Sequence, residues 1–159
     1  MGEVHFYHLT RTPREAVLPV LIARARDAGW RVEVRGTQSA AMQELDMALW
    51  RGPDDAFLPH GLCGGPHDAL QPVLLTAAGQ APAPPCDCVL TIDGAAITPA
   101  EIADRARVCI LFDGGDPAML AQSRALWKAC VAAGCVAKYW SQESGRWEMK
   151  AQAGQPAPQ

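Results

Sequence analysis

Three aspartates stand where predicted β-strands end, at Asp93, Asp113 and Asp116. Ligands of open α/β sheets bind outside the carboxyl ends of the strands, so the position of these residues, together with the fold type, is the only support for a small phosphate- or nucleotide-binding α/β enzyme. Such enzymes commonly hold phosphate on a glycine-rich turn after the first strand, because bare amides must approach the ligand closely. Residues 9–13, Leu-Thr-Arg-Thr-Pro, contain no glycine. The enzyme is therefore kept as the alternative, and Asp116 is interpreted as a helix cap.

A second group lies in a loop rich in glycine and proline and has the side chains of a metal site: His60, Cys63 and His67, with Cys86 and Cys88 further along. Imidazole and thiolate are the usual ligands of zinc in proteins. The spacing matches no common zinc module, and such residues arise easily by chance in a loop. We expect an ordinary loop. The alternative, a metal-stabilised interaction module, predicts loss of stability with a chelator.

No arrangement typical of nucleophilic catalysis is present. The G-x-S-x-G motif, which exposes a serine on a sharp turn, is absent. His5 and His8 fall on the first predicted strand, where alternate spacing is more typical of half-buried residues than of a proton relay. His8 is the better placed of the two, because it lies at the strand's carboxyl edge. We assign no catalytic residue, no cofactor and no metal.

The elements that must position these side chains alternate between strand and helix. Apolar runs predict strands at residues 4–9, 31–35, 72–76, 88–92, 108–112 and 135–140. Helical spacing predicts helices ending near 28, 50 and 133, and a short one after 98. This order favours one domain built on a parallel α/β sheet.

Capping residues mark the helix boundaries. A side-chain oxygen followed by proline begins a helix well, because proline has no N–H to leave unsatisfied at the first helical position. Three such starts are present: Thr12-Pro13-Arg14-Glu15, Thr98-Pro99-Ala100-Glu101 and Asp116-Pro117. Gly29 and Gly134 are predicted to end the first and last helices in the left-handed conformation that glycine adopts without strain.

Length and composition exclude several classes of protein. A chain of 159 residues can bury one core without disulfides, and the six cysteines are interpreted as reduced thiols. No run approaches the roughly 20 apolar residues of a membrane helix, and no signal peptide begins the chain, so we expect a soluble, cytoplasmic protein. A formal net charge of −3 argues against broad binding to nucleic acid.

Seven short segments are informative when they are taken together, in their order and spacing. They are Phe6-Tyr-His-Leu-Thr10, Gly29-Trp-Arg-Val32, Leu45-Asp-Met-Ala-Leu-Trp50, Phe57-Leu-Pro-His-Gly61, Gln71-Pro-Val-Leu-Leu-Thr76, Arg124-Ala-Leu-Trp-Lys128 and Tyr139-Trp-Ser-Gln142. This constellation resembles the chi-subunit family of the DNA polymerase III clamp-loader assembly. The resemblance covers nearly the whole chain, from Phe6 to Trp147.

The resemblance implies a Rossmann-like three-layer sandwich, with a mostly parallel central sheet and helices on both faces, and no catalytic activity. We expect residues 1–150 to form this chi-like domain. Residues 151–159 show no periodicity and are expected to form a disordered tail.

The resemblance also implies two protein partners. One is psi, the small subunit that links chi to the clamp loader. The other is the acidic C-terminal tail of single-stranded-DNA-binding protein, which ends in a phenylalanine carboxylate. DNA would be reached only indirectly, and no membrane is involved.

The expected tail-binding residues are Arg124, Trp127, Lys128 and Tyr139. Arg124 and Lys128 are four apart on one predicted helix and so share a face, with Trp127 beside them. Positively charged side chains beside a flat aromatic surface can bind a peptide that ends in an aromatic ring and a free carboxylate. Without the resemblance, an ordinary solvated helix face over a core tryptophan would explain the same residues. Tyr139 is carried over by its spacing in the family.

The expected psi-binding residues form an aromatic-rich segment in a predicted loop: Trp50, Phe57, Leu58, Pro59 and His60. Aromatic residues in a loop are typical of protein interfaces. The alternative is that Trp50 and Phe57 close the core below the loop.

Overall fold

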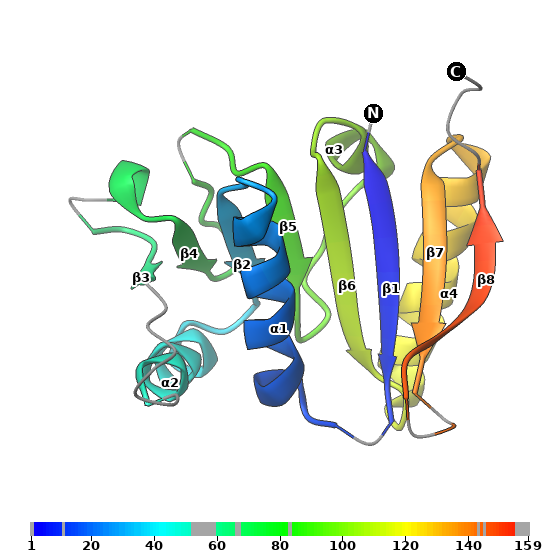
Figure 1. Cartoon of the computed structure of the whole chain (residues 1–159), viewed down its shortest axis with the longest axis horizontal. Coiled ribbons are helices and arrows are strands. Elements are labelled where there is room, and N and C mark those ends of the chain that lie inside the picture. Colours follow the sequence, from blue (N-terminus) through cyan, green and yellow to red (C-terminus); the bar gives the residue numbers. More distant parts are fainter. Residues whose placement is uncertain are drawn as a thin grey trace.

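A computed structural model describes residues 2–10, 12–51, 60–65, 68–82, 84–142, 144 and 146–154 (Figure 1). The strands are β1 (Glu3–Leu9), β2 (Val32–Arg35), β3 (Gly61–Leu62), β4 (Val73–Thr76), β5 (Cys88–Thr91), β6 (Arg107–Asp113), β7 (Val136–Ser141) and β8 (Glu148–Ala153). The helices are α1 (Arg14–Asp27), α2 (Ser39–Trp50), α3 (Pro99–Ala103), α4 (Pro117–Ala132) and the short 3-10 helix η1 (Asp68–Leu70).

The strands form one sheet in the order β3-β4-β2-β5-β6-β1-β7-β8. Every neighbouring pair is parallel except β7 and β8. The first strand, β1, therefore lies inside the sheet, between β6 and β7. The predicted α/β class with a mostly parallel sheet is confirmed.

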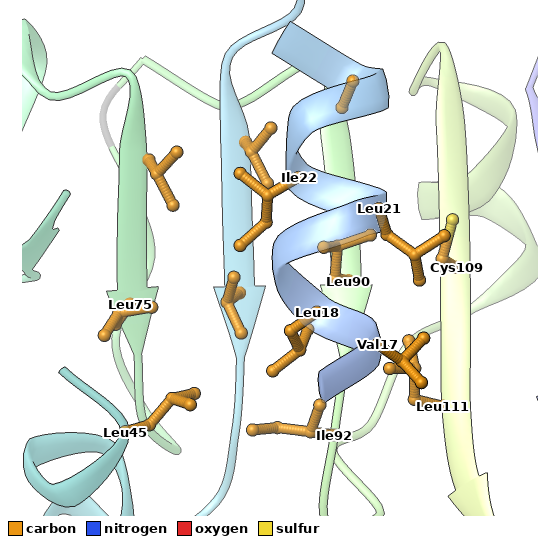
Figure 2. Packing of buried hydrophobic residues seen from close by; sticks show 14 of the residues in the cluster. Val17, Leu18, Leu21, Ile22, Leu45, Leu75, Leu90, Ile92, Cys109 and Leu111 are labelled. Atoms are coloured by element: carbon orange, nitrogen blue, oxygen red, sulfur yellow. The ribbon is translucent and has the colours of Figure 1, made fainter. Parts of the chain in front are cut away.

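Two apolar clusters lie on opposite faces of the sheet, because successive residues of a strand point to opposite sides. On the front face in Figure 1, α1 and α2 pack on alternate residues of β2, β4, β5 and β6. Figure 2 shows Val17, Leu18, Leu21 and Ile22 of α1 pointing onto these strands. Each such buried side chain contributes about 1.5–3 kcal/mol of hydrophobic stabilisation. On the back face, α3 and α4 cover the other residues of β1, β6 and β7.

The element boundaries follow the sequence patterns closely. All six predicted strands are present, each within one or two residues of the predicted ends, and so are the four predicted helices. Asp116 caps α4 by accepting hydrogen bonds from the amides of Ala118 and Met119, at 2.9 and 3.3 Å. Thr98 caps α3 in the same way from the amide of Glu101. Gly29 and Gly134 have φ values of 83° and 80°, as left-handed caps require.

The cap predicted at Thr12 is wrong. Helix α1 begins at Arg14 after Pro13, and no side chain caps it. The hydroxyl of Thr12 instead accepts a hydrogen bond from Nε2 of Gln142, at 3.1 Å, while Oε1 of Gln142 accepts from the amides of Thr10 and Thr12. A partner 130 residues away in the chain has displaced the local capping interaction.

The predicted boundary at residue 150 falls inside a strand. Three residues assigned by the sequence to the tail, Ala151–Ala153, belong to β8 and pair with β7. Residues 155–159 lie outside the described residues.

A buried polar network ties α3 to the sheet. The guanidinium of Arg35 forms ion pairs with Glu33, which is almost fully buried, and with Glu101 of α3. Arg35 donates two hydrogen bonds to the carboxylate of Glu33, and the hydroxyl of Thr76 donates a third, at 2.7 Å. Buried carboxylates are tolerated when they are paired in this way.

Candidate functional site

The exposed side of α4 presents two cations. Arg124 and Lys128 are both exposed, and neither forms an ion pair with another described residue. They lie four residues apart, so they occupy the same side of the helix, as the sequence predicted. These side chains are available to an anionic partner.

Beside them, an aromatic cluster fills the space between α4 and the back face of the sheet. The ring of Trp127, on α4, lies edge-on to Phe6 at 5.4 Å and to Tyr139 at 6.0 Å between centroids. Phe6 on β1 and Tyr139 on β7 are paired in register. Both Trp127 and Tyr139 remain partly exposed. The structure thus brings three of the predicted tail-binding residues to one helix face and places the fourth, Tyr139, against Trp127.

Two further residues complete the cluster, and the sequence did not identify them as members of the site. Nδ1 of His8 and the hydroxyl of Tyr139 share a hydrogen bond of 2.9 Å, and the ring of His8 stacks on Phe112 at 5.1 Å. Alternation along β1 places His8 on the same face as Phe6, which was the available signal. Register with β7 and β6 was needed to show which rings they meet.

The turn after β6 approaches this cluster closely. A Cβ added at Gly114 would lie 1.8 Å from Nε2 of His8. Glycine is therefore required for His8 to hold its position under Tyr139. The arrangement as a whole offers partly exposed rings beside two cations, which is the chemistry that an aromatic residue with a nearby carboxylate needs.

The predicted psi-binding residues are described only in part. Trp50 is 51 % exposed at the end of α2 and packs against the ring of His60, with centroids 4.2 Å apart and the ring planes tilted by 30°. His60 is buried and its Nε2 lies 3.2 Å from a carboxylate oxygen of Asp46. Phe57, Leu58 and Pro59 lie outside the described residues. Trp50 is thus a surface residue, and the alternative that it closes the core is wrong.

The aspartates at the strand ends line a separate cleft of about 440 Å³. It lies where α1 leaves β1 toward one face and α4 leaves β6 toward the other, which is where open α/β sheets bind ligands. Their carboxylates already have partners within the protein. Asp93 pairs with Arg14, Asp113 accepts from the amide of Gly115, and Asp116 caps α4. An acidic lining of this kind repels phosphate.

The metal-type residues do not converge within the described part of the chain. No group of three or more His, Cys, Asp or Glu side chains there has the geometry of a metal site. His67 lies outside the described residues. Burial raises the pKa of the Cys86 thiol to about 11, so this sulfur is a neutral thiol at pH 7. All six cysteines are free, in agreement with their interpretation as reduced thiols.

Of the helices described, none combines the length and apolarity needed to cross a bilayer.

The chain is similar to one known protein family. The model of this family, described as DNA polymerase III chi subunit, HolC, matches residues 1–138. The matched range includes Arg124, Trp127 and Lys128 and ends one residue before Tyr139. No curated protein matches the chain.

Proposed function

The chain belongs to the DNA polymerase III chi subunit family, and from this premise we propose that it is a non-catalytic adaptor between the replicase and single-stranded-DNA-binding protein. An accessory role in DNA polymerase III follows from the family. The adaptor role, its two partners and the surfaces that bind them are our proposal.

The observation that carries the proposal is the pairing of free cations with partly exposed rings on one side of the molecule. Arg124 and Lys128 face the acidic residues and terminal carboxylate of the tail, while Trp127 and Tyr139 receive its phenylalanine ring. Charge-assisted hydrogen bonds to a carboxylate are stronger than neutral ones, and ring contacts add specificity.

The second surface of the adaptor is proposed at the end of α2. Trp50, exposed and supported by the buried ring of His60, serves as an anchor for psi, together with Phe57, Leu58 and Pro59. Exposed tryptophans on a rigid support are frequent anchors in protein interfaces. In Figure 1, α2 and α4 lie at opposite ends of the sheet and on opposite faces, so both partners can bind at once.

The proposed adaptor has no catalytic chemistry of its own. It needs no cofactor, acts in the cytoplasm at the replisome and contacts DNA only through its partner. The placement of α1 and α2 opposite α3 and α4 supports the Rossmann-like three-layer sandwich that the resemblance implies.

The experiment is a titration of the chain into a fluorescently labelled peptide with the acidic, phenylalanine-terminated tail sequence, followed by anisotropy. A control peptide lacks only the terminal phenylalanine. We expect binding that requires the phenylalanine and weakens as salt rises from about 50 to 300 mM, because exposed charges are screened. Equal binding of both peptides, or of neither, would refute the tail-binding role.

The alternative function, a small phosphate- or nucleotide-binding enzyme, has one observation in its favour, the cleft at the carboxyl ends of β1, β5 and β6. A melting-temperature shift with ATP, GTP or NAD would support it. The acidic lining of the cleft makes us expect none.

A further inference from the structure

A groove separate from both proposed surfaces runs along α1 on the front face of the sheet. Its volume is about 560 Å³, and α1 forms one wall while β1 and β7 form the floor. We call it the front groove. In Figure 1, α1 and α2 cover the half of this face that contains β2 and β5, and no helix of the described chain lies in front of β1 and β7. Parallel strands are normally covered on both faces, so this half is incompletely covered.

Aromatic rings held in fixed positions form the floor. Tyr7 contacts Trp147 edge-on at 5.3 Å and Trp140 at 6.4 Å between centroids. The indole N–H of Trp140 donates to Nδ1 of His5, at 3.2 Å, which fixes the orientation of the ring. A floor with few free rotamers loses little entropy when a ligand covers it.

The rim of the groove carries apolar side chains in water. Val20, on the wall formed by α1, is 51 % exposed, and Met149, paired with Trp140 in register, is 46 % exposed. Apolar surface around a concave site is typical of protein-interaction sites.

Positive charge collects at one end. Arg24 lines the groove, and no carboxylate is among its described lining residues. Arg107 lies over the ring of Trp30 at 5.3 Å, and neither arginine forms an ion pair with a described residue. Arg107 begins β6 and is paired in register with the first residue of β1, which forms part of the floor. Burial raises the pKa of the Tyr7 phenol, and the charges of Arg107 and Arg24 oppose that rise.

We propose that the front groove binds an amphipathic helix of a partner protein, with bulky apolar side chains over the floor and acidic side chains at the end marked by Arg24 and Arg107. A helix satisfies its own backbone groups and can lie beside α1 as α1 lies on the sheet. Strands of seven residues such as β1 span about 23 Å, the length of a helix of about 15 residues. The groove lies on the opposite face of the sheet from the α4 site, and its occupation is independent of the function proposed above.

The test uses the full chain and two synthetic helical peptides of about 15 residues. They share one stripe of Leu and Phe and differ only in their flanking residues, Glu in one and Lys in the other. Binding is followed by the NMR signals of the tryptophan indole N–H groups. We expect the Glu peptide to bind and to shift the Trp140 and Trp147 signals, and the Lys peptide to bind at least about tenfold more weakly.

Matched variants locate the site. Val20→Glu should weaken the Glu peptide at least about tenfold, whereas Val131→Glu, a similar change at an exposed position of α4, should not. Arg24→Glu should reverse the preference between the two peptides. Melting curves establish that each variant folds.

Three results would overturn the proposal: a dissociation constant above about 1 mM for the Glu peptide, equal affinity for both peptides, or shifts confined to Trp127. The labelled tail peptide, measured on Val20→Glu in parallel, should bind as it does to the unmodified chain. This measurement distinguishes an error in the proposed groove from an error in the proposed tail-binding role.

Discussion

The hydroxyl of Tyr139 and Nδ1 of His8 share a hydrogen bond of 2.9 Å across two neighbouring strands, although 131 residues separate them in the chain. Tyr139 also contacts Trp127, Phe6 and Phe112. The bond thus fixes a ring that lies between the core of the back face and the cations of α4. The α4 site therefore depends both on its cations and on the support of the Tyr139 ring.

The first prediction concerns the cations. Lys128→Glu and Arg124→Glu should each weaken tail-peptide binding at least about tenfold, because each removes a charge-assisted contact and adds repulsion. Both side chains are exposed, so melting temperatures should change little. Arg26→Glu, a charge reversal at an exposed position of α1, is the matched control and should bind normally. Unchanged affinity in both α4 variants would remove the site assignment.

The second prediction concerns the support of Tyr139. Gly114→Ala places a methyl group where His8 lies and should destabilise the fold by about 1–3 kcal/mol while weakening tail binding. The double variant Gly114→Ala, His8→Ala should regain stability, because the obstructing ring is gone. Urea unfolding and peptide anisotropy measure the two effects. If the single variant keeps full stability and affinity, His8 does not position the site.

The third prediction concerns psi. Trp50→Ala should weaken binding to purified psi by about 2 kcal/mol, roughly thirtyfold, since exposed tryptophans on a rigid support are typical interface anchors. The unfolding midpoint should be nearly unchanged, because half of the side chain is already in water. Val131→Ala truncates an exposed apolar residue elsewhere and is the control. Normal psi binding by Trp50→Ala, measured by calorimetry, would place the psi interface outside this surface.

The fourth prediction concerns pH. Hydrogen bonds from Arg35 hold the pKa of Glu101 below its ordinary value. A carboxyl with a lowered folded pKa stabilises the protein above its unfolded pKa of about 4.3, and this stabilisation is lost as the pH falls through the folded value. Glu101→Gln should therefore destabilise the protein at pH 7 and much less near pH 3.

Urea unfolding at several pH values measures that difference. Glu44→Gln removes an exposed carboxylate that pairs with no described residue, and should differ little from the unmodified chain at either pH. A Glu101→Gln effect that is the same at pH 7 and near pH 3 would contradict the proposed origin of the pKa shift.

Local sequence patterns predicted most of the fold, because the start and end of a helix or strand depend mainly on residues that are close together in the chain. Apolar runs and, in some segments, alternation marked the strands, and the caps at Asp116 and Thr98 form from residues within three positions of each other. The cap at Thr12 was wrong because Gln142 competes for the same hydroxyl, and no local pattern reports a partner so distant. Strand β8 was not predicted. Its polar and apolar residues alternate, but two of its three apolar residues are alanines, and it is a largely exposed strand at the edge of the sheet.

Only the part of the α4 site that lies within one helix could be predicted from local sequence. The i, i+4 spacing placed Arg124 and Lys128 together, since the helix itself fixes that geometry. The contribution of His8 depends on which strands flank β1, and this is a property of sheet order rather than of any segment. The match to the family ends at residue 138, yet Tyr139 and Trp140 form hydrogen bonds with residues of β1, and Gln142 forms them with the turn that follows β1.

The position of β1 inside the sheet also sets an order of events during synthesis. Both of its neighbours, β6 and β7, are translated after residue 106, so β1 cannot pair until the chain beyond that residue has been made. Until then its apolar residues are unprotected, and contacts so far apart in sequence form slowly. Nascent chains that stall before β6 should therefore depend on chaperones, whereas chains that include β6 and β7 can complete the sheet on both sides of β1.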